Sequence, residues 1–184
     1  MVSGLRPTIT KVHLALNNYK VHFMSNLQFH IEPGAWQMIK NDSLTYLMGY
    51  DFQMLGWDRE AQTIDFALRF DDKGGHCQRH RHLASTTVLV MEGEQHLTEI
   101  HSSGKTTSKI RIKGEYARSH GADQNPHMER GGPDGGVVFY SCYAPDGRLF
   151  ELVDDDGTII REVTFDDMIG AWEHYQEEVR AAIS

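Results

Sequence analysis

The sequence predicts an all-β domain, a barrel or sandwich of about ten short strands with a helix at its C-terminal end. From residue 44 onward, short stretches in which apolar and polar residues alternate are separated by turns rich in glycine and aspartate. In the last stretch the apolar residues recur at intervals of three and four, which is the period of an amphipathic helix. A chain of 184 residues can hold one such domain and an appended segment.

The composition is that of a globular protein, with 40% hydrophobic and 24% charged residues. The net charge of −8 argues against a nucleic-acid partner, whose phosphate backbone attracts basic proteins. Neither a signal peptide nor a membrane-spanning apolar segment is recognisable. The two cysteines, Cys77 and Cys142, are too few for a disulfide scaffold. We therefore expect a cytoplasmic protein with no nucleic acid and no membrane among its partners.

Residues 1–43 are expected to form an N-terminal arm rather than part of the barrel. Their apolar stretches are short, and Pro33 and Gly34 mark a break in the chain. We expect the arm to pack on the barrel, which would occupy residues 44–184, or on a second subunit of a homodimer or larger homo-oligomer.

The clearest strand is predicted over residues 62–70, where Ile64, Phe66, Leu68 and Phe70 fall on one face. Residues 131–136 contain four glycines and a proline and are expected to form a loop, and Gly93 is expected to end the strand before it. The further strands are expected at 44–48, 52–55, 80–92, 95–101, 106–113, 114–118, 137–143, 148–153 and 158–163.

The C-terminal helix is predicted to begin after Thr164, which forms a capping box with Asp167. We expect the helix to lie on the barrel as a lid through one apolar face. That face comprises Phe165, Met168, Ile169, Trp172, Val179 and Ile183.

His80 and His82 form the most informative pair of residues. In an extended segment they point to the same side, and so do Ala84, Thr86, Val88 and Val90. Two imidazoles about 7 Å apart at their Cα atoms, from two rises of about 3.3 Å, can converge on one metal ion. The competing interpretation is a pair of polar residues on the surface.

The segment from Gly75 to Gly93 resembles the first motif of the cupin superfamily, the RmlC-like proteins. That motif has a glycine, a spacer, His-x-His, an acidic residue and a second glycine. Here the spacer before His80 is one residue shorter than usual, and Thr86 or Thr87 stands in the place of the glutamate. The resemblance implies a double-stranded β-helix, the cupin jelly-roll barrel.

The segment from Gly114 to His127 is similar to the second cupin motif, which carries a third histidine. His120 occupies the usual proline place, and His127 falls two residues later than the usual histidine. We expect His127 to be the third metal ligand beside His80 and His82, because a loop bulge can absorb two extra residues. His120 remains the alternative third ligand.

Because it lacks this glutamate, the sequence resembles the branch of cupins that cleaves acetylacetone and dihydroxyacetophenone. In that branch three histidines bind non-haem iron. The resemblance implies Fe(II), although three imidazoles also suit Zn, Ni or Cu. It implies a dioxygenase that uses O₂ to cleave a C–C bond in a small β-diketone or aromatic ketone. The residues expected to support the metal are Gln78, Thr86, Tyr116, Arg118 and His120.

Two other functions agree with the same sequence. One is a non-catalytic cupin that senses a metal or ligand, as the cupin domains of anti-sigma factors do. The other is a cupin lyase, hydrolase or isomerase that keeps the metal but uses different chemistry.

Overall fold

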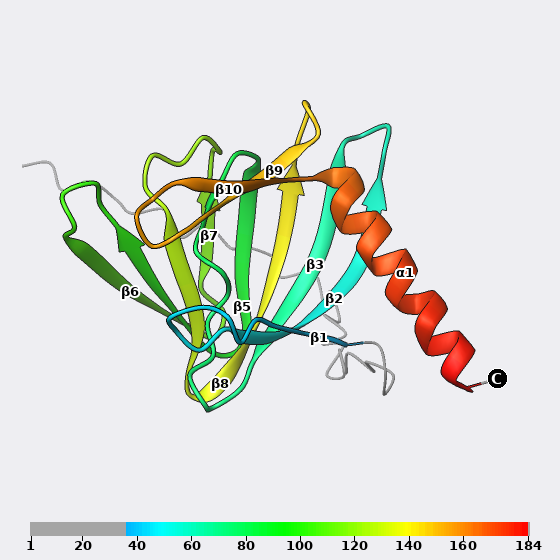
Figure 1. Ribbon diagram of the computed structural model, residues 1–184, viewed down its shortest axis with the longest axis horizontal. Helices are drawn as coiled ribbons and strands as arrows, with labels where there is room; N and C mark the ends of the chain where they lie inside the picture. Colours follow the sequence, from blue (N-terminus) through cyan, green and yellow to red (C-terminus); the bar gives the residue numbers. More distant parts are fainter. Residues whose placement is uncertain (1–35, 184) are drawn as a thin grey trace, which may run out of the picture. The chain divides into compact units, whose positions relative to one another are not determined.

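The computed structural model describes residues 36–183, which belong to the larger of two units of the chain, residues 31–184 (Figure 1). Residues 1–35 of the predicted arm lie outside the described residues. The remaining residues of that segment include an edge strand, β1 (Gln37–Lys40), which pairs antiparallel with β2. In the described part of the chain, no helix has the length and apolar character of a membrane span.

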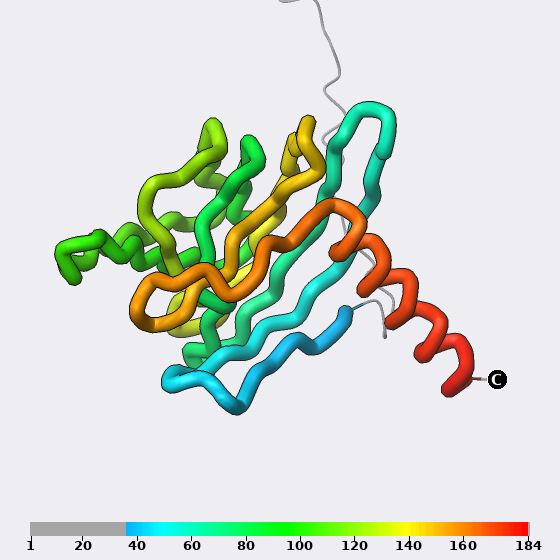
Figure 2. Tube along the Cα trace, turned by 45° about the horizontal axis from the view of Figure 1, so that its top comes forward, coloured from blue at the N-terminus to red at the C-terminus, as the bar shows by residue number. Residues whose placement is uncertain are grey.

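Strands dominate the described residues, and one helix follows them. The strands are β1 (Gln37–Lys40), β2 (Gly49–Asp58), β3 (Thr63–Phe70), β4 (His80–His82), β5 (Ser85–Ile100), β6 (Thr106–Ile112), β7 (Tyr116–Ser119), β8 (His127–Tyr143), β9 (Arg148–Val153) and β10 (Ile159–Thr164). The helix is α1 (Phe165–Ile183), which follows β10 directly (Figure 2). The expected double-stranded β-helix with a C-terminal helix is confirmed.

Two long strands, β5 and β8, connect the halves of the barrel. The strand order is β1-β2-β3-β8-β4-β9-β10, while β5 pairs with β6, β7 and β8. The C-terminal half of β8 lies between β3 and β5, and its first residue, His127, pairs with His80 of β4 and Glu99 of β5. In this way β8 brings its N-terminal residues next to the His80–His82 segment.

The glycine-rich stretch 131–136 is part of β8, so the prediction of a loop there is wrong. The register between β5 and β8 shifts here, from Gly93 opposite Gly136 to Gln95 opposite Gly131. Glycine is needed because the backbones approach closely: a Cβ atom at Gly136 would lie 2.2 Å from the carbonyl oxygen of Glu94. Gly93 has a φ of 61° and lies within β5, so the prediction that it ends the strand is also wrong.

The other strand predictions hold in outline, with two exceptions. The strand expected at 80–92 is interrupted after His82, and its second part joins the strand expected at 95–101 to form one long strand, β5. The segment 44–48 is not a strand, because Met48 makes only an isolated bridge to His76. In β3 the predicted apolar face is buried, and the ring of Phe66 stacks on Tyr140 of β8 with centroids 5.0 Å apart. Aromatic and aliphatic side chains therefore fill the barrel beside the histidines.

Helix α1 starts with the predicted capping box. The Thr164 N–H donates to Asp167 Oδ2 (2.8 Å), and the Asp167 N–H donates to Thr164 Oγ1 (3.2 Å). Phe165 and Ile169 are buried, and the ring of Trp172 meets Phe52 edge-on, with centroids 5.8 Å apart. The N-terminal half of α1 thus packs on the barrel, as expected of a lid. Ile183, at the other end of the predicted apolar face, is 81% exposed, so the prediction is wrong for the last turn.

Candidate metal centre

Three histidines from two strands converge inside the barrel. His80 and His82 point to the same side of β4, and His127 lies directly opposite His80 on β8. The Nε2 atoms of His80 and His82 are 3.1 Å apart. The ring centroid of His127 lies 4.4 Å from the centroid of His80 and 4.9 Å from the centroid of His82. One nitrogen from each ring lies within 4.8 Å of the other two, so these three residues could hold a metal ion.

The tautomer of His80 follows from a backbone contact. Its Nδ1 lies 2.8 Å from the carbonyl oxygen of Gln78. A carbonyl only accepts hydrogen bonds, so Nδ1 carries a proton, which leaves Nε2 as the ring nitrogen that can bind a metal. This hydrogen bond orients His80 in the way that backbone carbonyls commonly orient metal-ligating histidines.

The other two histidines are held in the neutral form. Burial, followed by the proximity of His80 and of the Arg111 guanidinium, keeps the pKa of His82 well below its ordinary value. The same causes, with His82 added, lower the pKa of His127. Neutral imidazole is the form that binds a metal.

The geometry fits a divalent cation. Metal–nitrogen bonds of about 2.0–2.1 Å place neighbouring ligand nitrogens about 3.0–3.4 Å apart, and the separation between His80 and His82 falls in this range. His127 Nε2 is buried and has no hydrogen-bond partner among the described residues. A bound metal would satisfy this atom.

Glu129 is a buried carboxylate beside the histidines that the sequence-based reasoning missed. It is 2% exposed, and its Oε1 lies 3.8 Å from His127 Nε2. Tyr140 donates to its Oε2 (2.6 Å) and Gln95 to its Oε1 (2.8 Å). Glu129 stands two positions after His127 on β8, so the alternation of side chains could have revealed it.

Glu129 also belongs to a second group that could hold a metal ion, with Cys77 and His80. Burial and the nearby Glu129 raise the pKa of the Cys77 thiol well above its ordinary value. Cys77 Sγ instead accepts the backbone N–H of Glu129 (3.1 Å). This N–H already engages Cys77 Sγ, whereas His127 Nε2 has no hydrogen-bond partner among the described residues, so the three histidines form the better donor set.

The histidines lie at the boundary between two cavities. One, of about 300 Å³, is lined mostly by apolar side chains, including Phe66, Phe150 and Met168. The other, of about 380 Å³, is more polar. His82 and Glu129 line both cavities.

The structure brings only some of the predicted supporting residues to the site. Gln78 lines the apolar cavity, and Thr86 and Arg118 line the polar one. Tyr116 lines neither cavity and is 63% exposed. His120 is exposed and lies outside the histidine cluster, which contains His127.

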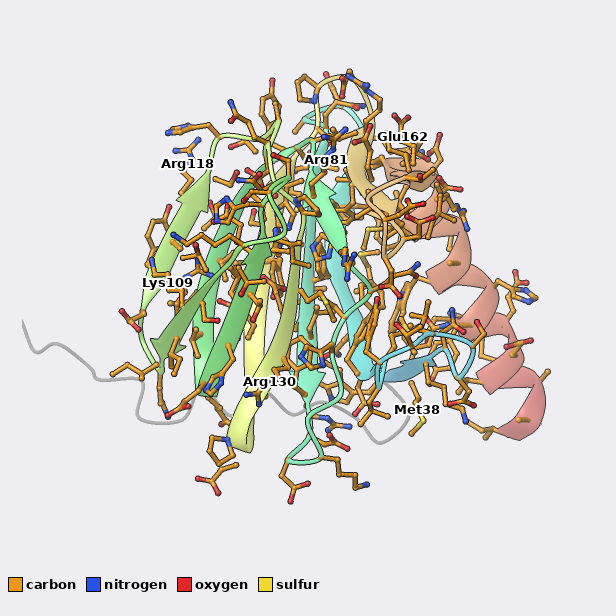
Figure 3. All side chains as sticks on the ribbon, turned by 60° about the vertical axis from the view of Figure 1, so that its left-hand side comes forward. Met38, Arg81, Lys109, Arg118, Arg130 and Glu162 are labelled. Carbon is orange, nitrogen blue, oxygen red and sulfur yellow. The ribbon has the colours of Figure 1, made fainter. Side chains whose placement is uncertain are left out.

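Charged residues next to the histidines occupy other parts of the fold. Arg81, between His80 and His82, pairs with Glu151 of β9. Figure 3 shows Arg81 and Arg130 near opposite ends of the fold, and Arg118 and Lys109 along the edge far from α1. Alternation along the strands thus keeps Arg81 apart from the imidazoles.

The comparisons with known proteins show the fold. No protein-family model matches the sequence, and no curated protein matches it. An acetylacetone dioxygenase from Acinetobacter johnsonii is similar in structure, with 16% identity and a TM-score of 0.50 over 79% of this chain and 89% of that one.

Two further cupin structures are similar. An RmlC-like cupin protein from Ralstonia eutropha has 10% identity and a TM-score of 0.55 over 80% of this chain and 86% of its own. A cupin 2 conserved barrel domain protein from Rhodopseudomonas palustris has 17% identity and a TM-score of 0.51 over 67% of this chain and 79% of its own. The described chain has the cupin fold.

Proposed function

We propose that this protein is a mononuclear non-haem Fe(II) dioxygenase that cleaves a C–C bond in a small β-diketone or aromatic ketone. The observation that carries the proposal is the convergence of His80, His82 and His127 at the edge of an apolar cavity. Three neutral ligands do not offset the charge of a divalent cation, and the one carboxylate beside them, Glu129, offsets only part of it. This favours an anionic, chelating substrate such as an enolate. The similarity in fold to an acetylacetone dioxygenase supports this choice.

The ligands assigned to the metal are Nε2 of His80 and a ring nitrogen from each of His82 and His127. When bound, Fe(II) would chelate the enolate and activate O₂. The protein supplies the orientation of the rings, through the hydrogen bond from His80 to the Gln78 carbonyl. It also keeps His82 and His127 neutral at physiological pH.

The apolar cavity is proposed to bind the ketone and to exclude water. Phe150 meets the rings of His80 and His82 edge-on, at centroid distances of 5.6 and 5.2 Å. Of the acidic residues lining the two cavities, Glu129 alone lines both. Its carboxylate is therefore the group proposed to accept the proton that the substrate loses on forming the enolate.

Oxygen uptake tests the proposal. The protein would be loaded with Fe(II) under anaerobic conditions and mixed with oxygenated acetylacetone or dihydroxyacetophenone. We expect substrate-dependent oxygen consumption that His80→Ala and His82→Ala abolish and that His120→Ala, a change at an exposed histidine, retains. Consumption that persists in the first two variants would reject the site, and no consumption with any diketone or hydroxyacetophenone would reject the reaction.

A metal-dependent lyase or isomerase is the second candidate, and the buried carboxylate of Glu129 favours it. A carboxylate beside a bound cation can move protons without any redox step. A lyase or isomerase should turn over substrate when the protein is loaded with Zn(II) and oxygen is absent. A dioxygenase should show no turnover under those conditions.

A further inference from the structure

Arg111 of β6 lines the polar cavity and has an unusual environment. Its Nη1 donates to Gln95 Oε1 (2.6 Å), a neutral acceptor. Its Nε is buried and has no hydrogen-bond partner, and no carboxylate within residues 36–183 forms an ion pair with it. A buried N–H without a hydrogen-bond partner is costly, and a partly buried guanidinium is normally paired with an anion.

The orientation of Arg111 is fixed by residues behind it. Gln95 is 0% exposed, and its amide Nε2 donates to Glu129 Oε1 (2.8 Å) and lies 3.0 Å from the Tyr140 hydroxyl. These contacts leave the Gln95 carbonyl facing Arg111. The neutral amide also stands between Arg111 and Glu129, whose second oxygen already accepts the Tyr140 hydroxyl.

The acidic groups of the polar cavity have neutral partners of their own. Glu99 Oε1 accepts from Asn125 Nδ2 (2.8 Å), and Asp123 Oδ1 accepts from the Ser119 hydroxyl (2.7 Å). Gln95 takes Nη1 of Arg111, and the other edge of the guanidinium carries the unpartnered Nε together with Nη2. This is the edge that binds a carboxylate through two parallel hydrogen bonds. The same cavity is lined by His82 and His127, two of the candidate metal ligands.

We propose that Arg111 binds a carboxylate of the substrate inside the polar cavity, so that the substrate is an acidic ketone rather than a neutral one. This inference rests on the proposed function, because it assigns the substrate class of the same site. The carboxylate lies against Arg111, the enolisable ketone reaches the histidine cluster, and any apolar end extends into the apolar cavity.

The test uses two probes that share one chelating group. The probes are 4,6-dioxoheptanoate, which carries a carboxylate, and heptane-2,4-dione, which does not. Binding to the Zn(II)-loaded protein would be measured by calorimetry. The variant is Arg111→Gln, and the control is Lys109→Gln, an exposed residue of the same strand that lines neither cavity.

We expect the carboxylated diketone to bind at least about tenfold more tightly than the neutral one, as a charge-assisted hydrogen bond provides. Arg111→Gln should remove this difference, and Lys109→Gln should keep it. Arg111→Lys retains the charge but loses the planar edge, so it should keep part of the affinity difference between the two diketones. This variant replaces Arg111→Gln in the test if Arg111→Gln fails to fold. Equal affinities in the unmodified protein, or a difference that survives in Arg111→Gln, would overturn the assignment.

A second measurement separates this inference from the proposed function. If neither diketone binds, the proposed function fails, and glutarate titrated into the metal-free protein tests Arg111 alone. Glutarate binding that is lost in Arg111→Gln and kept in Lys109→Gln supports the carboxylate site, and its absence in the unmodified protein overturns it. A tenfold preference for the carboxylated diketone without oxygen uptake by the Fe(II) protein would reject the dioxygenase alone.

Discussion

His80 and His127 lie directly opposite each other across the antiparallel strands β4 and β8, and they are the only residues that pair these two strands. The pairing joins a short strand that follows the glycine-rich turn after β3 to the first residue of the longest strand. It also determines which histidine completes the cluster, because His120 lies outside the paired segments. The candidate metal centre therefore depends on a long-range strand pairing.

Replacing a cluster histidine should weaken metal binding. His82→Ala and His127→Ala should each reduce affinity for Zn(II) or Fe(II) by at least about 100-fold, since removing a direct ligand exceeds the 10–100-fold cost of losing a residue that only orients one. His120→Ala is the matched control and should bind like the unmodified protein. Metal content after dialysis and a competition titration with a chromophoric chelator measure the effect, and a normal affinity in His127→Ala would contradict the assignment.

Tyr140→Phe should destabilise the fold. The Tyr140 hydroxyl is buried and donates 2.6 Å to the Glu129 carboxylate, so its loss leaves one carboxylate oxygen without that donor. A hydrogen bond to a charged group contributes about 1.5–3 kcal/mol. Tyr143→Phe, at a position 51% exposed, should change the free energy of unfolding by less than about 0.5 kcal/mol. Urea denaturation of both variants checks the difference, and equal stabilities would count against the buried network.

Gly136→Ala should destabilise the protein by about 2 kcal/mol or more, because its Cβ would collide with the backbone of Glu94. Gly170→Ala is a useful comparison, since Gly170 lies in α1 and its Cβ would have no neighbour within 4 Å. Alanine there should stabilise the helix by about 0.5–1 kcal/mol. Thermal unfolding of the two variants should shift in opposite directions, and a neutral Gly136→Ala would contradict the close approach of β5 and β8.

Several of these features could be predicted from the sequence because they depend on local periodicity. Alternation after His80 placed Ala84, Thr86, Val88 and Val90 on one face, and all four are buried. The capping box of α1 is equally local. These patterns depend only on neighbouring residues, so no knowledge of strand pairing was needed.

The remaining features depend on contacts between distant strands. Residues 131–136 have the composition of a loop, but their glycines serve the close approach of β8 to β5. Glu129 alternates with His127 on the strand before these glycines, but its contacts with Gln95 and Tyr140 appear only in the folded sheet. Arg111 lies on β6, opposite Gln95 of β5, and only the folded sheet shows that the two side chains meet.

The metal-free protein should lose stability as the pH falls below about 6.5. The lowered pKa values of His82 and His127 keep both rings neutral in the folded state, whereas unfolded histidine binds a proton with a pKa of about 6.5. Because the unfolded state then binds more protons, the free energy of unfolding rises with pH in this window and declines on acidification, by up to about 1.4 kcal/mol per pH unit for each histidine.

Urea denaturation in the presence of a chelator, at pH values of about 7.5 and about 5.5, measures this dependence. His127→Gln removes one of the two groups and should make the loss of stability smaller. His120→Ala should leave the loss unchanged, since that side chain is exposed. A stability that rose on acidification would contradict the burial of neutral imidazoles.

The most direct test of the metal centre is a crystal structure of the Fe(II)-loaded protein with anomalous data at the iron edge. We predict one anomalous peak per chain, bonded to ring nitrogens of His80, His82 and His127 at about 2.0–2.2 Å. A peak bound by other residues, or histidine rings that remain in mutual contact without a metal at full Fe(II) loading, would contradict the account.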